Sequence, residues 1–410
     1  MDNVKLVHIT TVPFSLVVFF SGQVGWMKRH GFDVHAIASP GDLLDTFSRH
    51  CAVPVHAVPM SRRITPLADL VALWRLYRTL RKLRPHIVHA HTPKGGLLGG
   101  LAAWLAGVPV RVYTVHGLPL MTARGLKRRL LRWSERIACR CAHQVFAVGH
   151  SIGQVVVQEG ICPAARIKVL LSGSIDGVDG AGRFNPARVG QEARRSVRRK
   201  HGIPQDAVVL GFVGRIVRDK GMIELAEAWR TLRAEFPSLH MLLAGPFEPQ
   251  DPVPADVEAL FRSDPRVHLS GHVAETERYY AAMDISVLPS YREGLPVAPL
   301  EAAAMNVPVV ATRIPGCVEA VVDGVTGTLV PCRAAAALAA ALRRYVSDPE
   351  LRRQHGQAGR QRVLRDFQAE AIRRALYEEY VHLLQDKGLS TPDRGSEAST
   401  SPDFQAERAA

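Results

Sequence analysis

The sequence predicts an α/β protein with two doubly wound domains, each built on a parallel sheet that helices cover on both faces. First, the 410 residues exceed one ordinary core and suit two domains of roughly 150 to 200 residues. Second, short β-branched runs alternate with helix-length segments, which is the pattern of βαβ units. Third, this alternation stops at a basic stretch, residues 194–204, and then starts again, so the same architecture occurs twice.

The strands follow from the apolar, β-branched runs. In the first half we expect strands over residues 4–10, 34–38, 86–91, 110–115, 144–148 and 167–171, with helices that include 66–84 and 124–142. In the second half we expect strands over residues 208–213, 240–244, 266–269, 285–289, 308–312 and 327–331. A ligand is expected in a cleft at the carboxyl ends of the two sheets, where open α/β proteins bind ligands.

The boundaries follow from the same pattern. We expect a first domain over residues 1–172, a linker over 173–204, a second domain over 205–365 and a tail over 386–410. The segment 366–385 predicts a C-terminal helix that packs back on the first domain. The tail has almost no large apolar residues, which predicts disorder.

Several classes of protein are disfavoured. The apolar run 14–20 falls short of the ~18 residues of a membrane span, and no basic leader precedes it, so we expect a cytosolic protein without a secretory signal. The six cysteines are scattered, and Cys139 and Cys141 lack the spacing of a zinc site. Reduced thiols and no metal are the expectation.

The charge is unevenly distributed. Residues 1–200 hold 29 Lys and Arg against 10 Asp and Glu, whereas residues 201–410 hold 23 against 28. This asymmetry predicts an anionic partner for the first half, either nucleic acid or a membrane surface. Two basic segments, 67–84 and 124–142, carry Trp74 and Trp133 on apolar stripes that are expected to pack on the sheet. Base-reading motifs are missing, so the membrane surface is favoured and nucleic acid is not expected.

The loop after the strand at 208–213 combines cations with glycines. Gly214 and Arg215 follow the strand, and Lys220 stands where a helix begins. Two cations beside a helix N-terminus suit a diphosphate, although a surface Arg and a solvated Lys are an equal alternative. The segment is neither a Walker A loop nor G-x-G-x-x-G.

A second motif places two carboxylates around a tight turn after the strand at 285–289. Glu293 falls in the loop, Pro296 suits a first helical turn, and Glu301 lies on the helix, where it could accept from ribose hydroxyls. The alternative is that both glutamates pair with Arg292 or Arg313. Backbone N–H groups at the turn would face a phosphate; they belong to Gly294, Leu295 and Val297.

Two further candidates stand at strand ends of the first half. His116 directly follows the strand at 110–115, where it could hydrogen-bond a substrate hydroxyl or carbonyl. Lys94 stands beside a glycine pair after the strand at 86–91, which is a weaker signal. The chain has 17 histidines, so a structural role is the usual expectation for any one of them.

These motifs together resemble a known family. The segments GRIVRDKG (214–221), SYREGLPVAPLEAAAMNVPVVAT (290–312) and GCVEAVVDGVTGTLVP (316–331) resemble the donor domain of the retaining GT-B glycosyltransferases of family 4. Their E-x7-E signature is matched by Glu293 and Glu301. The stretch 91–119 is similar to bacterial enzymes that build polysaccharide or O-antigen on a polyprenyl-diphosphate carrier, among them those that add N-acetylhexosamines. The resemblance extends from the first strand to about residue 385.

The resemblance implies a role for each motif residue. Arg215 and Lys220 would hold the diphosphate of a nucleotide-sugar donor, most simply UDP-linked, together with the amides of residues 294–297. Glu301 would bind the ribose, Glu293 would face the donor sugar, and His116 would contact the transferred sugar. Neither glutamate is implied as a covalent nucleophile. No D-x-D triplet occurs, so neither a metal ion nor another cofactor is expected.

Two rival functions stay open. A nucleotide-sugar epimerase would share the architecture but need no lipid acceptor and no basic half. A non-catalytic basic protein that binds membranes or nucleic acid would not need Glu293, Arg215 and Lys220, and all three are present. The chain departs from its relatives at Asp176, which stands in a lengthened loop where an Asn is usual.

Overall fold

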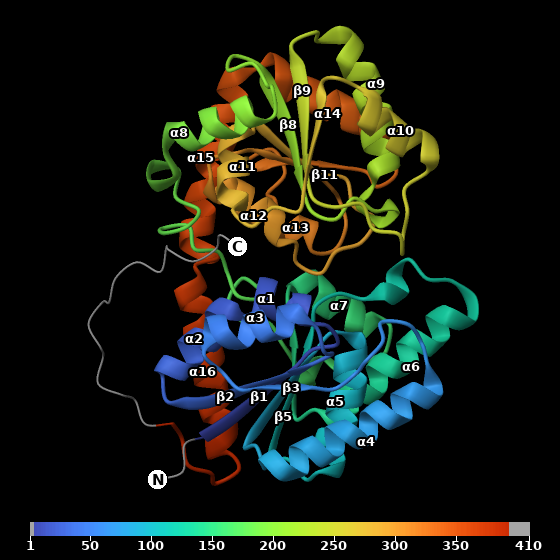
Figure 1. Cartoon of the computed structure of the whole chain (residues 1–410), viewed down its shortest axis with the longest axis vertical. Helices are drawn as coiled ribbons and strands as arrows, with labels where there is room; N and C mark the ends of the chain where they lie inside the picture. Colours follow the sequence, from blue (N-terminus) through green and yellow to red (C-terminus); the bar gives the residue numbers. More distant parts are fainter. Residues whose placement is uncertain (1–3, 393–410) are drawn as a thin grey trace. The chain divides into compact units, whose positions relative to one another are not determined.

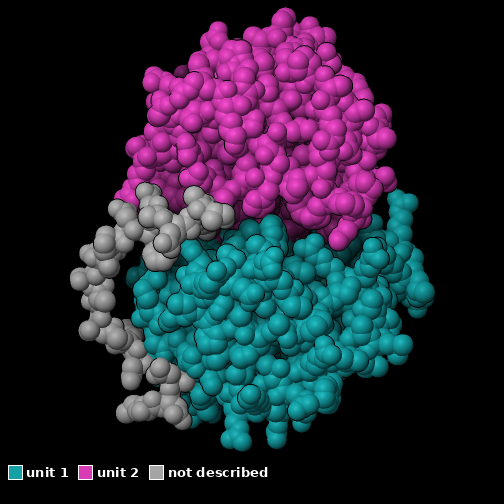
Figure 2. Space-filling view, viewed as in Figure 1, with its two compact units in different colours: residues 1–176, 370–410 teal, residues 177–369 magenta. Residues whose placement is uncertain are grey.

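The computed structural model describes residues 4–392. It divides into two compact units, which Figure 2 distinguishes by colour. Unit 1 consists of the described parts of Met1–Asp176 and Glu370–Ala410, and unit 2 of Gly177–Ala369. The chain therefore passes from one unit to the other twice.

Unit 1 contains a seven-stranded sheet in the order β3-β2-β1-β4-β5-β6-β7. Every pairing in it is parallel. The strands are β1 (Val4–Ile9), β2 (Phe32–Ala38), β3 (Val55–Ala57), β4 (Ile87–His91), β5 (Val110–Val115), β6 (Gln144–Ala147) and β7 (Ile167–Lys168). The order reverses direction between β1 and β4, which makes this pair the switch point where doubly wound sheets bind ligands.

Helices cover both faces of this sheet (Figure 1). They are α1 (Pro13–Phe19), α2 (Ser21–Arg29), α3 (Asp42–Cys51), α4 (Pro66–Leu83), α5 (Pro93–Leu105), α6 (Gly125–Cys141), α7 (His150–Gln158) and α16 (Ala369–Gln385). Helix α16 comes from the far end of the sequence, and its Leu376, Tyr380 and Leu384 are buried in the same core as Phe32 of β2. Thus the last helix completes the unit that the first strand begins.

Unit 2 repeats the architecture with six strands in the order β10-β9-β8-β11-β12-β13, all parallel. The strands are β8 (Val208–Val213), β9 (Leu239–Ala244), β10 (Val267–Gly271), β11 (Ile285–Leu288), β12 (Val309–Thr312) and β13 (Gly327–Val330). The helices are α8 (Pro186–Lys200), α9 (Met222–Glu235), α10 (Ala255–Ser263), α11 (Thr276–Ala282), α12 (Val297–Ala304), α13 (Cys317–Ala320), α14 (Ala335–Ser347) and α15 (Pro349–Asp366). The switch point lies between β8 and β11. The predicted fold class of two doubly wound domains is confirmed.

The predicted linker over 173–204 is wrong in most of its length. Residues 177–204 belong to unit 2, and residues 186–200 among them form α8. Arg198 is fully buried, donates to the carbonyls of Ala207 and Ala282, and lies 2.8 Å from the Asp284 carboxylate. Arg198, one cation of the basic stretch 194–204, thus anchors α8 in unit 2. Some of the positive charge of the first half of the sequence therefore belongs to unit 2.

The start of the predicted tail also differs. Leu389 packs against the core of unit 1, and its N–H donates to the carbonyl of Leu384. Ordered structure therefore continues past residue 386. Residues 393–410, on which the rest of that prediction falls, lie outside the described residues. No helix in the described part of the chain is long and apolar enough to cross a bilayer.

Asp176 has a structural role in unit 1. Its two carboxylate oxygens each accept a hydrogen bond of 2.7 Å from the Arg373 guanidinium. These residues stand near the two places where the chain leaves and re-enters unit 1. A carboxylate matches the bidentate geometry of the guanidinium, which the amide of an Asn would not.

Candidate functional site

The cation motif and the glutamate motif meet at the switch point of unit 2. Gly214 and Arg215 follow β8, residues 289–296 follow β11, and these two strands are neighbours. Because the strands are parallel, both loops leave the carboxyl edge of the sheet. This is the position at which doubly wound sheets bind ligands.

An ion pair joins the two loops. Lys220 Nζ lies 2.5 Å from Glu293 Oε1, and these side chains are only 20% and 11% exposed. One residue earlier, the backbone carbonyl of Asp219 accepts from the N–H of Tyr291 at 2.9 Å, and the Asp219 carboxylate accepts from Arg292 Nε at 2.7 Å. The sequence therefore folds two separate motifs into one site.

Gly221 permits this close approach. Its φ of +71° lies in the left-handed region, and a Cβ there would stand 2.0 Å from the carbonyl oxygen of Pro289. Any other residue would push the Lys220 loop away from the Glu293 loop.

Arg215 is held by a residue that the sequence analysis missed. Its Nη1 lies 2.7 Å from Glu248 Oε2, and its side chain is 41% exposed. Glu248 follows β9, the strand next to β8, so the rule that sites lie at strand ends could have found it. Both cations of the site are thus paired with carboxylates that an anionic ligand could replace.

The turn after Glu293 leads directly into α12. Pro296 is the N-cap, with φ −72° and ψ 124°, so the helix begins one residue later than the sequence suggested, at Val297. The first N–H groups of a helix have no acceptor within it. Gly294 lies so close to the next loop that a Cβ on Gly316 would stand 1.8 Å from its carbonyl oxygen. Leu295, between Gly294 and the N-cap Pro296, is buried.

Glu301 lies on α12 and accepts a hydrogen bond of 3.1 Å from the hydroxyl of Tyr280, a second residue that the sequence analysis missed. Burial raises the pKa of Glu301 to about 7, against the opposing charge of Arg183. The alternative that Arg292 and Arg313 neutralise the two glutamates is wrong, because these arginines pair with Asp219 and Asp323.

His116 belongs to a histidine cluster at the switch point of unit 1. His8 on β1 pairs in register with His89 on β4, and His91 pairs with Thr114 on β5, two residues before His116. Alternation along strands places these side chains on one face of the sheet. His91 joins the others, with its Nε2 3.0 Å from His8 Nδ1 and its Nδ1 2.9 Å from His116 Nε2.

All four histidines of this cluster are held neutral. Burial lowers the pKa of His8 and of His116 to about 3, and burial with the neighbouring rings lowers the pKa of His89 and His91 well below the usual range. Histidines at alternate positions of strands (residues 89 and 91) were a signal that the sequence analysis did not use.

Lys94 is engaged within unit 1. Its Nζ lies 2.7 Å from Asp69 Oδ1, so its charge is already neutralised. The glycine pair beside it serves packing, because a Cβ on Gly96 would stand 2.2 Å from the ring of Tyr113. Contact of Lys94 with a ligand stays a prediction.

The outer face of unit 1 carries exposed apolar side chains. We predicted that the apolar stripes of the two basic helices, α4 and α6, pack on the sheet. For several of their large apolar side chains this prediction is wrong, because those side chains are exposed. Leu67 of α4 and Leu126 of α6 are 82% and 80% exposed. Other large apolar side chains of α4, α5 and α6 are also exposed; they are Leu70, Val71, Trp74, Trp104, Leu105, Leu130 and Trp133. These helices are neighbours on one face of the sheet (Figure 1).

The cations on this face are not equivalent. Arg75, Lys127 and Arg129 are exposed. Arg128 instead pairs with Glu159, and Arg132 Nε is buried without a partner among the described residues. The buried residues of α4 and α6 are instead mainly small or aliphatic, and they include Ala72, Leu76 and Ala138.

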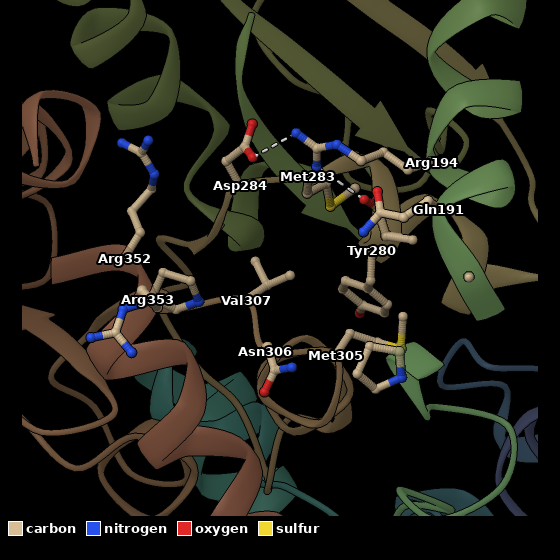
Figure 3. A pocket seen from close by; sticks show the side chains of 14 residues that line it. Gln191, Arg194, Tyr280, Met283, Asp284, Met305, Asn306, Val307, Arg352 and Arg353 are labelled. Atoms are coloured by element: carbon tan, nitrogen blue, oxygen red, sulfur yellow. Dashed lines mark hydrogen bonds and ion pairs between the residues drawn. The ribbon is translucent and has the colours of Figure 1, made fainter. Parts of the chain in front are cut away.

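A hollow of about 320 Å³ in unit 2 lies elsewhere (Figure 3). Arg194 points at Asp284, with a distance of 2.9 Å, and Arg353 pairs with Glu350. Asp284 precedes β11 and Val307 precedes β12, so the hollow lies at the amino edge of the sheet. Arg352, which also lines the hollow, donates to the carbonyl of Val346, and none of the motif residues lines the hollow.

Known proteins match both units. The family model "Glycosyl transferase 4-like domain" matches residues 16–173, and "Glycosyl transferases group 1" matches residues 193–362. The capsular polysaccharide biosynthesis glycosyltransferase CapM of Staphylococcus aureus is 31% identical over 94% of this chain and 99% of its own. The UDP-Gal:alpha-D-GlcNAc-diphosphoundecaprenol alpha-1,3-galactosyltransferase of Escherichia coli is 28% identical over 77% of this chain and 81% of its own.

A solved structure shares the fold. The HepE protein of Anabaena, in complex with UDP and glucose, superposes with a TM-score of 0.74 at 18% identity, covering 92% of this chain and 99% of HepE. The two family models fall on the two units in the order in which the sequence resemblance placed them. The chain therefore belongs to the family 4-type glycosyltransferases of GT-B fold.

Proposed function

We propose that this glycosyltransferase moves a sugar, an N-acetylhexosamine, from a UDP-linked donor to a polyprenyl-diphosphate-linked acceptor in cell-surface polysaccharide synthesis, with retention of configuration. The observation that carries the donor site is the meeting of Lys220, Glu293 and Arg215 at the β8/β11 switch point. The acceptor class is supported by the relative from Escherichia coli, whose name specifies a diphosphoundecaprenol substrate.

The donor diphosphate would displace the two carboxylates that now pair with the cations of the site. Its negative oxygens would take the positions of Glu293 and Glu248 beside Lys220 and Arg215. The two cations would then neutralise the charge that develops on the leaving diphosphate, helped by the free N–H groups at the start of α12. In this account no metal ion and no other cofactor is needed.

The two glutamates would then act on different parts of the donor. Glu293, released from Lys220, would face the sugar, and the acceptor would attack on the face that the diphosphate leaves. Glu301, eight residues further on, would accept hydrogen bonds from the ribose. His116 of unit 1 would contact an oxygen of the transferred sugar.

The lipid acceptor also accounts for the outer face of unit 1. Each exposed Lys or Arg near an anionic membrane contributes about 1 kcal/mol. Exposed Trp74 and Trp133 suit the interface between headgroups and acyl chains. We propose that α4, α5 and α6 attach the protein peripherally to an anionic membrane surface, by charge and by shallow apolar insertion together.

Two rivals make different predictions. An epimerase would convert one nucleotide sugar into another without an acceptor, and it would not use an apolar outer face. A non-catalytic binding protein would not need two cations held by replaceable carboxylates. The family membership favours transfer over the epimerase, and the Lys220–Glu293 pair favours transfer over the non-catalytic binding protein.

The test is an incubation of the purified protein with bacterial membranes and a panel of labelled nucleotide sugars. We expect label from one donor to enter the organic-solvent fraction and to be released by mild acid, as a polyprenyl-diphosphate-linked sugar would be. The Lys220→Ala variant is the matched control and should transfer little. Label that stays in water as an epimerised nucleotide sugar would support the epimerase instead.

A further inference from the structure

The histidine cluster of unit 1 forms a chain of hydrogen bonds that ends at His116. His8 Nδ1 lies 3.0 Å from His91 Nε2, and His91 Nδ1 lies 2.9 Å from His116 Nε2. The ring of Phe20 covers the chain, with its centroid 4.2 Å from that of His91 and 5.7 Å from that of His116. One nitrogen of His116, Nδ1, is left for a ligand.

The rings are neutral, and this restricts the protons. A neutral imidazole has one N–H and one bare nitrogen. His91 donates through only one of its nitrogens and must accept through the other. Both hydrogen bonds therefore run in the same direction along the chain, and only two arrangements are possible.

The two arrangements differ at both ends. If the protons point toward His116, all three rings carry their proton on Nδ1, and His8 Nε2 is a bare lone pair. If they point toward His8, all three carry it on Nε2, and His8 has a buried N–H. His8 is fully buried, and its Nε2 has no partner among the described residues. Buried N–H groups without an acceptor are rarer than buried acceptors without a donor, which favours the first arrangement.

We propose that His8 and His91 are positioning residues that hold His116 in its Nδ1–H tautomer, so that His116 donates a hydrogen bond to an oxygen of the sugar substrate. This inference rests on the proposed function only for the identity of the ligand. It assigns His116 the role of a neutral donor and not of a general base.

His89 lies in the same cluster but outside the chain. Its Nδ1 lies 2.5 Å from the Tyr380 hydroxyl and its Nε2 lies 2.6 Å from Thr114 Oγ1. Both of its nitrogens are therefore occupied. His89 is a matched control, because it is as buried as His91 yet makes no hydrogen bond to His116.

A metal site is the competing interpretation. His8, His89 and His91 each offer a nitrogen, and these atoms all lie within 4.8 Å of one another. An ion would have to break hydrogen bonds that already use both nitrogens of His89 and of His91. One equivalent of zinc or another transition metal in the purified protein would overturn the tautomer chain.

The direct test is a two-bond ¹H–¹⁵N correlation spectrum of the full chain labelled at histidine. The signals of His8, His91 and His116 are assigned by their loss in His8→Phe, His91→Leu and His116→Gln. We expect all three rings to show the Nδ1–H pattern, whereas exposed His272 shows the Nε2–H pattern that free imidazole prefers in water. An Nε2–H pattern for any of these rings in the wild-type protein would overturn the proposal, and one folded variant suffices for the assignment because the two hydrogen bonds give all three rings the same pattern.

Variants then separate positioning from structure. In His91→Leu, the His116 signal should shift to the Nε2–H pattern, and kcat should fall by ~10-fold with a small change in donor KM, as for loss of one hydrogen bond. His89→Gln should leave the His116 tautomer unchanged. An unchanged tautomer in His91→Leu would contradict the chain. Full activity of His116→Gln would overturn the proposed hydrogen bond from His116 to the sugar.

Discussion

Lys220 Nζ lies 2.5 Å from Glu293 Oε1, and this ion pair joins the two loops at the β8/β11 switch point. Lys220 is half-buried and already held by a carboxylate. It needs little reorganisation when an anionic ligand arrives, because the ligand takes the place of the Glu293 carboxylate beside it. The same geometry makes Lys220 and Glu293 mutually dependent. Their variants should therefore differ from those of the more exposed Arg215.

Removing either cation of the site should impair transfer. Lys220→Met and Arg215→Ala should each lower kcat/KM by ~10²-fold, as for loss of one preorganised charge contact. Lys220→Met should also lower Tm by a few degrees, because Glu293 stays half-buried without its cation, whereas Arg215→Ala should barely change Tm. Arg230→Ala, at an exposed pair with Asp256, is the control and should change neither. Near-normal turnover in both variants would refute the donor site.

Glu293→Gln should mainly lower kcat and leave the donor KM within a few-fold, since its contact with the sugar belongs to the reacting centre. Glu248→Gln is the matched control, because it frees Arg215 without removing a group from the sugar. Steady-state kinetics with varied donor will separate the two. If Glu248→Gln lowered kcat as strongly as Glu293→Gln, the assignment of Glu293 to the sugar would be wrong.

Glu301 should make donor binding depend on pH. Its pKa is raised to about 7 by burial, so the ionised form that accepts from ribose hydroxyls is favoured as pH rises through 7. The donor KM should therefore fall between pH 6 and 8, and Glu301→Gln should give a higher KM without this dependence. Buried Glu135 of unit 1 has a pKa raised in the same way, so Glu135→Gln is the control and should keep the wild-type KM profile.

The same shift has a consequence for stability. A carboxyl group with a raised pKa binds its proton more tightly when folded, so its contribution is full below pH 4.5 and is lost as pH rises through about 7. Relative to wild type, Glu301→Gln should therefore gain stability toward pH 8. A gain toward acid pH would contradict the burial of Glu301.

Much of the fold could be predicted from the sequence because buried parallel strands are continuous apolar runs. β3 was missed because its three residues, Val55–Ala57, are too short to form such a run. The linker prediction failed over α8 because the strand–helix alternation restarts only after the basic stretch, whereas Arg198 of α8 is satisfied by carbonyls and by Asp284 that are distant in sequence. Long-range pairing of this kind leaves no local pattern.

The sequence predicted the motif residues of the site but not the residues with which they pair. The strand-end positions of Arg215, Lys220 and Glu293 could be read from the sequence, since the architecture gathers such ends. Their pairing with Glu248 and with each other depends on which strands are neighbours, which only the sheet order gives. The outward turn of Trp133 was missed because helical spacing identifies a stripe without showing which way it faces.

The outer face of unit 1 should bind anionic vesicles. Charge reversal of exposed Lys127 and Arg129 to Glu should remove the electrostatic part of the binding. In the wild-type protein this part should weaken as salt shortens the Debye length from ~10 Å at 0.1 M to ~3 Å at 1 M. Trp74→Ser with Trp133→Ser should remove the part of the binding that survives high salt. Sedimentation with anionic and neutral vesicles measures both parts. Binding to DNA with no binding to vesicles would overturn the lipid-acceptor proposal.

The central claim is that the loops at the β8/β11 switch point bind a nucleotide diphosphate, and calorimetric titration without any acceptor tests it most directly. UDP, GDP, ADP and UMP should be titrated into the wild-type protein, Lys220→Met and the Arg230→Ala control. We predict that UDP binds at least ~10-fold more tightly than UMP, GDP and ADP, and that Lys220→Met removes the preference for UDP over UMP while Arg230→Ala keeps it. Equal affinity for UDP and UMP, or a preference that survives in Lys220→Met, would contradict the account.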